Sequence, residues 1–564
     1  MYAPCDEHRK PYIPTQHVTQ PTRHLPYEPP APDTQRLASV QFFCILMSTT
    51  VTDSSTAASG QPHLSKVTER NILIAMCTAL VAVVASMSGL NVAQQAIAVE
   101  LGSTQSGVLW IINAYSLALA ALLMPIGAIG DKWGRKPVLL TGLSLFALSN
   151  VGAILAQSTA QMIAARIVGG VGAAMIMPVT LSVITSSFPE EDRARAVGIW
   201  AGFAGSGGMI GLFVSAFTVD VLSWRWAFGL PILLAGLAFI ITMTNVPNSR
   251  EGDAHSFDIV GSVLSALAIG GLVLGIHEGP ERGWSHSITI AGLIVGVMSL
   301  VLFITWERKV TSPLLDISTF SDRGLASGVA TITIVFAVMF GIFLVLFPFL
   351  QAVLGWSALR SAIAMLPMAA VMMPTSTMAP RIAGRVGSRT TMLAGVTLFS
   401  SGLALLALRA SVEGGYLSVL PGLMIVGFGM GLTMTPATTA ITETLPPEKQ
   451  GVASALNDTS REIGGAVGMA LLGSVLSAAF RTEMTNSLIG LPDQAVDAAG
   501  EGIANAFGVA AQLTQSGKAD EALRIIDAAK HSFVSAWTSS MWVGVVLSAI
   551  AVGVLAVFGP RRAK

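Results

Sequence analysis

Residues 127–136 read GAIGDKWGRK and join two apolar segments, 106–130 and 137–156, each long enough to cross a lipid bilayer. A related stretch, RIAGRVGSR, stands at residues 381–389 between two further apolar segments. Both stretches combine basic residues with glycines, which allow tight turns and close helix contacts. Short basic loops between apolar segments are typical of the cytoplasmic side of a multi-pass membrane protein.

The composition of the whole chain agrees with a membrane protein. Of its 564 residues, 52% are hydrophobic and only 11% are charged, whereas a soluble protein carries about 25% charged residues. The formal net charge is zero, so no basic excess indicates a nucleic-acid partner. Short segments of alternating polarity, typical of a membrane β-barrel, are absent from the sequence. The chain is therefore predicted to be an all-α polytopic membrane protein.

Fourteen apolar segments are predicted to be membrane-spanning helices, because backbone polar groups in hydrocarbon must bond within their own segment. They cover residues 71–95, 106–130, 137–156, 160–187, 194–219, 226–245, 257–276, 287–305, 325–352, 358–379, 391–409, 416–443, 452–480 and 533–558. Lys and Arg concentrate in the loops after even-numbered segments, while the short loops on the other side contain only Arg225, Arg282, Arg360 and Arg409. This bias predicts that both termini are cytoplasmic.

An internal repeat relates the two ends of the chain. Pro178 and Thr180 recur as Pro436 and Thr438, at the same offset of 258 residues, and each pair lies in an apolar segment followed by Pro-Glu. A proline inside a helix frees a carbonyl group and bends the helix. Two halves that share this feature are typical of transporters built from parallel repeats. We therefore expect two bundles of six helices with two inserted helices between them.

This arrangement predicts the domain boundaries. The expected regions are a disordered cytoplasmic N-terminal tail at 1–70, a six-helix bundle at 71–245, two inserted helices at 246–312, a second six-helix bundle at 313–558 and a cytoplasmic tail at 559–564. Residues 481–532 are expected to form an extracellular loop with short amphipathic helices over 494–511 and 518–530. Met47 opens a Ser/Thr-rich stretch and is an alternative start of translation.

The loop at 127–136 resembles the signature loop of the major facilitator superfamily, and residues 71–558 are similar to its fourteen-helix drug:proton antiporter branch. Further matching phrases are Leu109-Trp110 with Tyr115, Trp224-Arg225-Trp226, and Trp306-Glu307-Arg308 followed by Pro313 to Asp316. The resemblance implies a major facilitator fold and a proton-coupled transporter in the cell membrane. It would export small lipophilic compounds or drugs by alternating access. The alternatives are a dedicated exporter of one metabolite or lipid and a membrane sensor that transports nothing.

The resemblance also assigns roles to residues. The loop would close the cytoplasmic side in one state and release it in the other, through Gly127, Asp131, Gly134, Arg135, Lys136 and the corresponding Arg385. Arg166, a charge inside the fourth segment, is linked by resemblance to proton coupling. Its alternative role is structural, with hydrogen bonds to helix carbonyls.

Acidic residues of the thirteenth segment are the predicted proton carriers. Asp458 and Glu462 are four residues apart and share a helix face with Arg461 close by, so desolvation can shift their pKa values. The alternative is a solvated helix start. Gly207 and Gly211 are expected to allow close packing in the fifth segment, although Leu212 stands where the family has a proline.

The predicted cavity lining is Asn91, Trp110, Asn113 and Tyr115. Ser86 stands where many family members have an acid that suits cationic substrates. No phosphate-binding loop, His/Cys ligand cluster or nucleophile pattern is present, so we expect neither an enzyme nor a metal or cofactor. The expected partners are the lipid bilayer, a small-molecule substrate and protons, but no nucleic acid, and the chain is expected to be a monomer.

Overall fold

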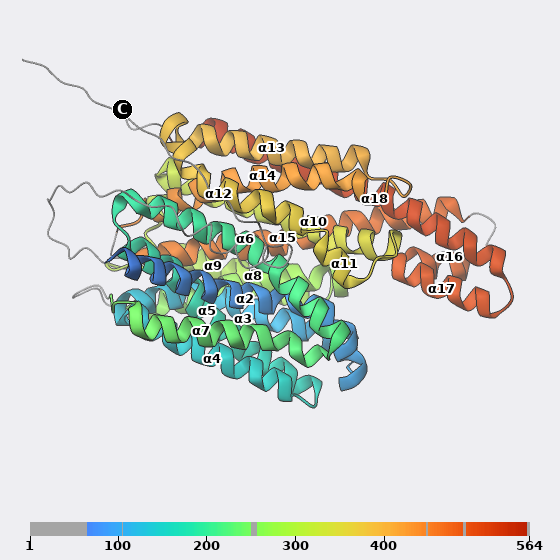
Figure 1. Cartoon of the computed structure of the whole chain (residues 1–564), viewed down its shortest axis with the longest axis horizontal. Coiled ribbons are helices and arrows are strands. Elements are labelled where there is room, and N and C mark those ends of the chain that lie inside the picture. Colours follow the sequence, from blue (N-terminus) through green and yellow to red (C-terminus); the bar gives the residue numbers. More distant parts are fainter. Residues whose placement is uncertain (1–64, 104, 250–256, 447–448, 489–491, 561–564) are drawn as a thin grey trace, which may run out of the picture. The chain divides into compact units, whose positions relative to one another are not determined.

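The computed structural model describes residues 65–103, 105–249, 257–446, 449–488 and 492–560. In these residues the chain consists of helices joined by turns and short connections (Figure 1). The predicted tail at 1–70 lies mostly outside the described residues, as does Met47. Its last residues are helical, because Ser65 accepts a hydrogen bond from the backbone N–H of Thr68 (3.1 Å) and so caps a helix that begins at Lys66.

The helices are distributed along the chain in three groups. The first group comprises α2 (Lys66–Leu101), α3 (Gln105–Trp133), α4 (Arg135–Leu155), α5 (Thr159–Ser187), α6 (Glu190–Val221), the 3-10 helix η1 (Trp224–Phe228) and α7 (Gly229–Asn245). The insert comprises α8 (Ile259–Arg282) and α9 (Ser287–Glu307). The last group comprises η2 (Ile317–Ser321), α10 (Arg323–Pro348), the π-helix η3 (Phe349–Val353), α11 (Ala358–Ile363), α12 (Leu366–Val386), α13 (Ser388–Arg409), α14 (Gly415–Thr442), α15 (Gln450–Ser487), α16 (Asp493–Gly500), α17 (Ile503–Gln515) and α18 (Ala519–Phe558).

Within the described residues, 14 helices are long and apolar enough to cross a membrane, which confirms the predicted number. The inserted helices are strongly apolar and bury little of their length: α9 buries 28% of its most apolar window, against 78% for α5. A helix whose apolar surface faces outward on most sides is suited to contact with lipid chains. The insert is therefore peripheral, and α5 lies at the centre of its bundle.

The same helix pairings recur in both groups, which confirms the arrangement of six plus two plus six helices. In the first group, α2 packs against α6 and α7, α5 packs against α3 and α4, and α4 packs against α7. In the last group, α10 packs against α15 and α18, α14 packs against α12 and α13, and α13 packs against α18. Each pairing in one half has its counterpart at the same place in the order of the other half, as parallel repeats require.

Two seams join the halves. Helix α3 packs against α15, and α6 packs against α12. These two contacts are equivalent, because α12 is the counterpart of α3 and α15 is the counterpart of α6. Helix α5 also contacts α15, and α6 contacts α14. The inserted helix α8 contacts both α3 and α15, so it spans the first of these seams. The helices on the two seams hold most of the predicted site residues.

The segment before the last membrane span differs from the prediction. The short helix expected at 494–511 is two helices, α16 and α17, separated at Glu501-Gly502. The helix expected at 518–530 is continuous with the last span, because no Pro interrupts α18 and its first Gly is Gly544. Helix α15 also continues to Ser487, beyond the predicted end at 480. The extensions of α15 and α18 pack together with α16 and α17 through buried side chains that include Met484, Ile525 and Phe533.

Glycines at the helix crossings leave no room for a side chain, and this generates a stability prediction. A Cβ on Gly468 of α15 would overlap the carbonyl oxygen of Ala337 in α10, whereas a Cβ on Gly553 of α18 would have no atom within 4 Å. We expect Gly468→Ala to destabilise the protein by about 1–3 kcal/mol, as overpacking does, and so to lower its melting temperature in detergent. Gly553→Ala is the matched control and should melt like the wild type; equal melting of the two variants would contradict the observed packing.

Candidate functional site

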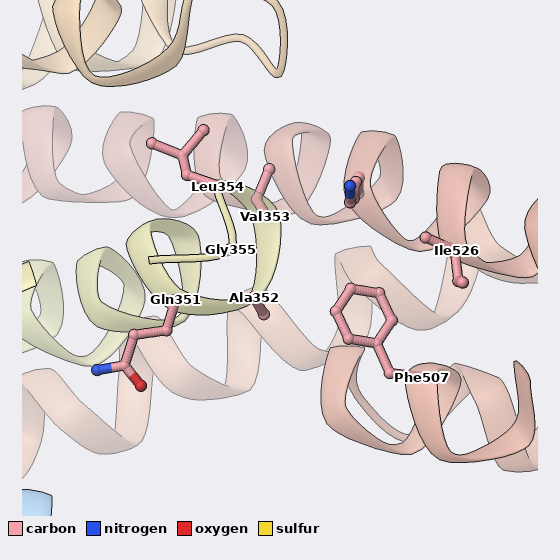
Figure 2. Close-up of a pocket in the computed structure, with 8 residues that line it drawn as sticks. Gln351, Ala352, Val353, Leu354, Gly355, Phe507 and Ile526 are labelled. Carbon is pink, nitrogen blue, oxygen red and sulfur yellow. The ribbon is translucent and has the colours of Figure 1, made fainter. Parts of the chain in front are cut away.

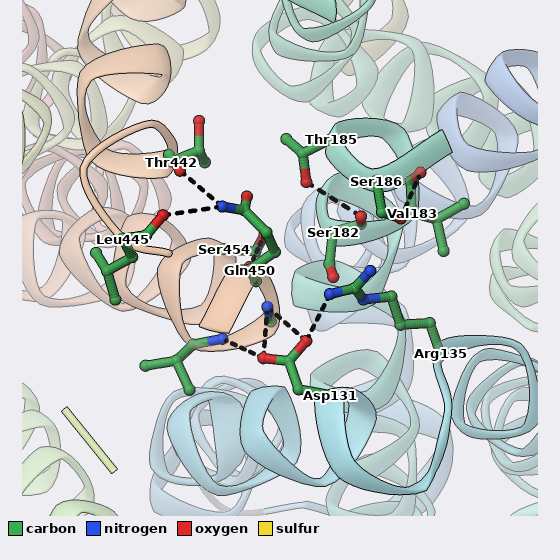
Figure 3. Close-up of polar contacts among 12 residues, drawn as sticks. Asp131, Arg135, Ser182, Val183, Thr185, Ser186, Thr442, Leu445, Gln450 and Ser454 are labelled. Carbon is green, nitrogen blue, oxygen red and sulfur yellow. Dashed lines mark hydrogen bonds and ion pairs between the residues drawn. The ribbon is translucent and has the colours of Figure 1, made fainter. Parts of the chain in front are cut away.

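Asp131 joins the two halves. Its carboxylate accepts hydrogen bonds from the backbone N–H of Gly451, at 2.7 and 2.9 Å, and from that of Val452, at 3.2 Å (Figure 3). These amides belong to the first turn of α15, where N–H groups have no partner within their own helix and the helix dipole is positive. A carboxylate of α3 in one half therefore caps a helix of the other half. We call this contact the Asp131 latch.

The neighbours of Asp131 fit the latch closely. Arg135 donates from Nη2 to Asp131 Oδ1 at 2.9 Å, and both side chains are buried. A Cβ on Gly127 would lie 2.5 Å from the carbonyl oxygen of Gly451, so only glycine allows α3 and α15 to come this close. Gly134, with φ of 108°, turns the chain from α3 into α4, and Gly387, with φ of 93°, does the same between α12 and α13.

Lys136 and Arg385 are the other charged residues predicted for the gating loop. Lys136 donates from Nζ to the carbonyl oxygen of Met243 in α7, at 2.9 Å, and this contact stays within its own half. Arg385 is exposed near the end of α12. The start of α15 is also held by its own half, because the Gln450 amide donates to the carbonyl oxygens of Thr442 (2.9 Å) and Leu445 (3.2 Å) (Figure 3).

Two turns farther along α15 lies a buried acid–arginine cluster. Asp458 is fully buried, so the alternative of a solvated helix start does not hold for it. Its Oδ1 lies 3.6 Å from Arg461 Nη1 and accepts a hydrogen bond from Asn457 Nδ2 at 3.1 Å, while Thr438 of α14 donates to Asn457 at 3.0 Å. Glu462 is half-buried and acts electrostatically on both Asp458 and Arg461. The three predicted residues are therefore brought together.

Arg461 is held between two aromatic rings that sequence reasoning missed. Its Cζ lies 4.8 Å from the ring centroid of Trp200 in α6 and 5.2 Å from that of Phe336 in α10. Such distances allow cation–π attraction, which is stronger in a desolvated site. No pattern in the sequence pairs Trp200 with Arg461, because the two residues belong to different halves of the repeat.

Arg166 lies within the first half and has no ionic partner among the described residues. Its guanidinium is 4.1 Å from the ring centroid of Tyr115 and donates to the carbonyl oxygen of Ile111 (3.3 Å) and to Ser86 Oγ (3.2 Å). Ser86 in turn donates to Asn150 Oδ1 at 3.2 Å. The bond to Ile111 is the kind that the structural alternative predicts, so the contacts account for the buried cation without an acid at position 86.

Tyr115 is the predicted lining residue that lies against Arg166. It is fully buried in α3 and lies within electrostatic reach of both Arg166 and Glu462. Of the other predicted lining residues, Trp110 is half-buried, and Asn113 Oδ1 lies 3.2 Å from Nδ1 of His277 in the inserted helix α8. The side chain of Asn91 lies outside those that the structure describes. The insert thus contacts a polar residue that the sequence assigns to the cavity.

The predicted packing residues lie at helix contacts within each half. A Cβ on Gly211 of α6 would overlap Ala85 of α2, and one on Gly207 would lie 3.3 Å from Val81. Pro178 and Pro436 are buried inside α5 and α14 at corresponding places in the two halves. The two prolines belong to helices that also contact the other half, since α5 contacts α15 and α14 contacts α6.

A pocket of about 320 Å³ lies away from these clusters (Figure 2). It is lined by η3 with the following turn, Gln351 to Gly355, and by Phe507, Ile526 and Lys530 of α17 and α18. None of the predicted site residues lines it. In the described residues, no group of three His, Cys, Asp or Glu side chains has the arrangement of a metal site.

A polar contact ties the helices at the end opposite the Asp131 latch. Glu100, near the end of α2, accepts hydrogen bonds from Trp224 Nε1 (2.5 Å) and from Arg225, and Arg225 also donates to the carbonyl oxygen of Ile154 at 3.1 Å. Hydrogen bonds from Arg225 and Trp224 lower the pKa of the Glu100 carboxyl group below its usual range. This contact stays within the first half and joins α2, α4 and η1.

Comparison with known proteins identifies relatives over most of the chain. The sequence model of the Major Facilitator Superfamily matches residues 74–469. The multidrug resistance protein Stp of Mycobacterium tuberculosis (strain CDC 1551 / Oshkosh) is 34% identical over 389 residues, which are 69% of this chain and 72% of Stp. The multidrug efflux pump LfrA of Mycolicibacterium smegmatis is 30% identical over 506 residues, covering 88% of this chain and 98% of LfrA.

A solved structure shares the fold. The proton:xylose symporter XylE, bound to 6-bromo-6-deoxy-D-glucose, superposes with a TM-score of 0.55 over 88% of this chain and 97% of its own. The two sequences are 13% identical, so the likeness concerns the fold alone.

The Asp131 latch generates a prediction. In Asp131→Asn, the hydrogen bonds to Gly451 and Val452 lose their charge assistance, which is worth roughly 1.5–3 kcal/mol for bonds to a charged group. We expect the amides at the start of α15 to exchange hydrogen at least tenfold faster, as measured by hydrogen–deuterium exchange on peptides covering residues 449–456. Asp520→Asn, which changes an exposed acid at the start of α18, is the control. Unchanged exchange in Asp131→Asn would show that the latch does not protect these amides.

Proposed function

The chain belongs to the Major Facilitator Superfamily and is a membrane transporter, and from this premise we propose that it exports small lipophilic compounds, antimicrobial drugs included, in exchange for protons. Two relatives, Stp and LfrA, are named for multidrug resistance and multidrug efflux. Their similarity extends over 69% and 88% of this chain, so it covers both halves in the case of LfrA. The fourteen helices fit the drug:proton antiporter branch that the sequence resembles.

The observation that carries the proton-coupled part of the proposal is the buried cluster of Asp458, Arg461 and Glu462. A carboxylate removed from water binds a proton more readily, while a neighbouring arginine opposes that binding. Buried acids inside membrane helices are costly and typically mark ion pathways. Helix α15 contacts α3 and α5 of the other half, so a change of charge on it acts on the seam between the halves.

We assign the Asp131 latch to the cytoplasmic side, with both termini in the cytoplasm, because Lys and Arg concentrate in the loops at that end. The described conformation is then closed toward the cytoplasm. Ser376 of α12 reinforces the closure, since it donates to the carbonyl oxygen of Gly198 in α6 at 2.9 Å. Transport would require both inter-half contacts to part, after which the substrate enters between the halves from the cytoplasmic side.

Two features bear on the substrate and the energy source. Ser86 provides no negative charge, and its hydroxyl is bonded to Arg166 and Asn150, so among the described side chains no acid beside Arg166 is available to pair with a cationic drug. Neutral or weakly charged lipophilic compounds therefore fit the site best. A membrane potential supplies roughly 2.3 kcal/mol per transported charge per 100 mV, which supports a useful concentration ratio with one or two protons.

The test measures drug efflux from cells and from proteoliposomes with an imposed pH gradient. We expect Asp458→Asn and Glu462→Gln to lose most pH-driven efflux, because neither side chain can release a proton, and Arg166→Ala to reduce it. Asp520→Asn changes an exposed acid and should behave as the wild type. Near-normal efflux in both acid variants would refute the assignment of the proton carriers. Unchanged drug resistance on overexpression, together with retention of a single metabolite in cells that lack the protein, would favour a dedicated exporter.

A further inference from the structure

We propose that Arg461 is the positioning residue that transmits the protonation of Asp458 to the seam between the halves, through its contact with Trp200. The inference rests on the proposed proton coupling and adds a mechanism for it. Three observations carry it: the origin of the two rings around Arg461, the incomplete bonding of the cluster, and its position relative to the Asp131 latch.

The two rings come from different halves. Phe336 belongs to α10, which packs against α15 in the same half and moves with Arg461. Trp200 belongs to α6 in the other half and is anchored there, since its Nε1 donates to Thr180 Oγ1 of α5 at 3.1 Å. When the halves part, Arg461 keeps the phenyl ring and loses the indole. The Trp200 contact is therefore the member of the pair that reports the state of the seam.

The cluster is buried but incompletely bonded. Arg461 is 4% exposed, yet its Nε and Nη2 atoms have no hydrogen-bond partner, and neither does Asp458 Oδ2. Buried polar atoms without hydrogen-bond partners destabilise a structure, so this cluster favours a second arrangement in which these atoms are bonded. Of the two carboxylates that act on Arg461, Asp458 is the one that forms an ion pair with it. The charge of Arg461 in the closed seam is thus offset mainly by Asp458.

Protonation of Asp458 removes this offset. The proton binds a carboxylate oxygen, and the guanidinium then lies between two rings with only the half-buried Glu462 acting on it. An uncompensated buried cation costs more free energy than contact with an aromatic face returns. Arg461 reaches water only if Trp200 moves away from it, which requires α6 and α15 to separate. Proton uptake therefore favours the state that is open at the latch end.

The other groups around the cluster leave this direction unchanged. Helix α14 presents Thr438 and α10 presents Phe336, neither of which carries a charge. In the first half, Tyr115 of α3 is acted on electrostatically by both Glu462 and Arg166 of α5. The next acid toward the start of α15 is Asp131 of α3, which is bonded to Arg135, Gly451 and Val452. None of these groups replaces Asp458 as the ion-pair partner of Arg461.

The experiment reads the opening of the seam directly. Ser454 is fully buried on α15, between the latch and the cluster, so a cysteine there is reached only when the latch end opens. In a background with Cys5, Cys44 and Cys77 changed to Ala, Ser454→Cys is labelled with an impermeant maleimide from the latch side at several pH values, with rates corrected for thiolate content. We expect labelling to rise about tenfold on acidification, as the loss of one buried ion-pair partner would allow.

Matched variants separate the two rings. Trp200→Leu should label fast at every pH, Trp200→Phe should restore the pH dependence because it keeps a ring face, and Phe336→Leu should retain that dependence. A pH response in Trp200→Leu equal to that of the parent would overturn the inference, as would its equal loss in Phe336→Leu. Asp458→Asn tests the underlying function separately. If Asp458→Asn still responds to pH, the assignment of Asp458 as a proton carrier fails. If Asp458→Asn abolishes the pH response but Trp200→Leu does not, that assignment stands and the role of Arg461 is refuted.

Discussion

The first-turn amides of α15 depend on a group from the other half of the molecule. The N-cap position, Lys449, offers no side-chain acceptor to them, and the carboxylate of Asp131 bonds both Gly451 and Val452 instead. A helix end that is capped across a seam is fully satisfied only while the seam is closed. Opening of the seam at this end therefore also breaks the hydrogen bonds that cap α15. The charged groups farther along α15 lie on the same helix and are affected by the same change.

Sequence reasoning predicted what depends on local pattern. Hydropathy placed the fourteen spans, and the repeated Pro and Thr gave the order of the two halves, which the recurring helix pairings match. Spacing along one helix was sufficient to bring Asp458, Arg461 and Glu462 together. The glycines of residues 127–136 indicated a tight approach, although not its partner, because Gly451 lies 320 residues away from Asp131 and carries no distinguishing pattern.

Contacts between side chains on different helices were not predictable from the sequence. Trp200 and Phe336 look like ordinary apolar residues in the sequence, and only the packing of α6 and α10 against α15 places their rings around Arg461. The prediction for the final span began too late, at residue 533, because hydropathy is low over the first part of α18. Hydrogen bonding continues there regardless, since residues 519–532 include no Pro or Gly to stop it.

The insert breaks the equivalence of the two seams. Helix α8 rests on α3 and on α15, one from each half, and its His277 contacts Asn113 of α3. When the halves rotate, a helix seated on both cannot follow both, so it must shear along at least one of them. The glycine contact between Gly271 and Gly296 holds α8 to α9, so the pair slides as one body. One seam of this transporter thus includes a helix pair that must slide during the conformational change, and the resistance to that sliding affects how fast the two halves interconvert between their states.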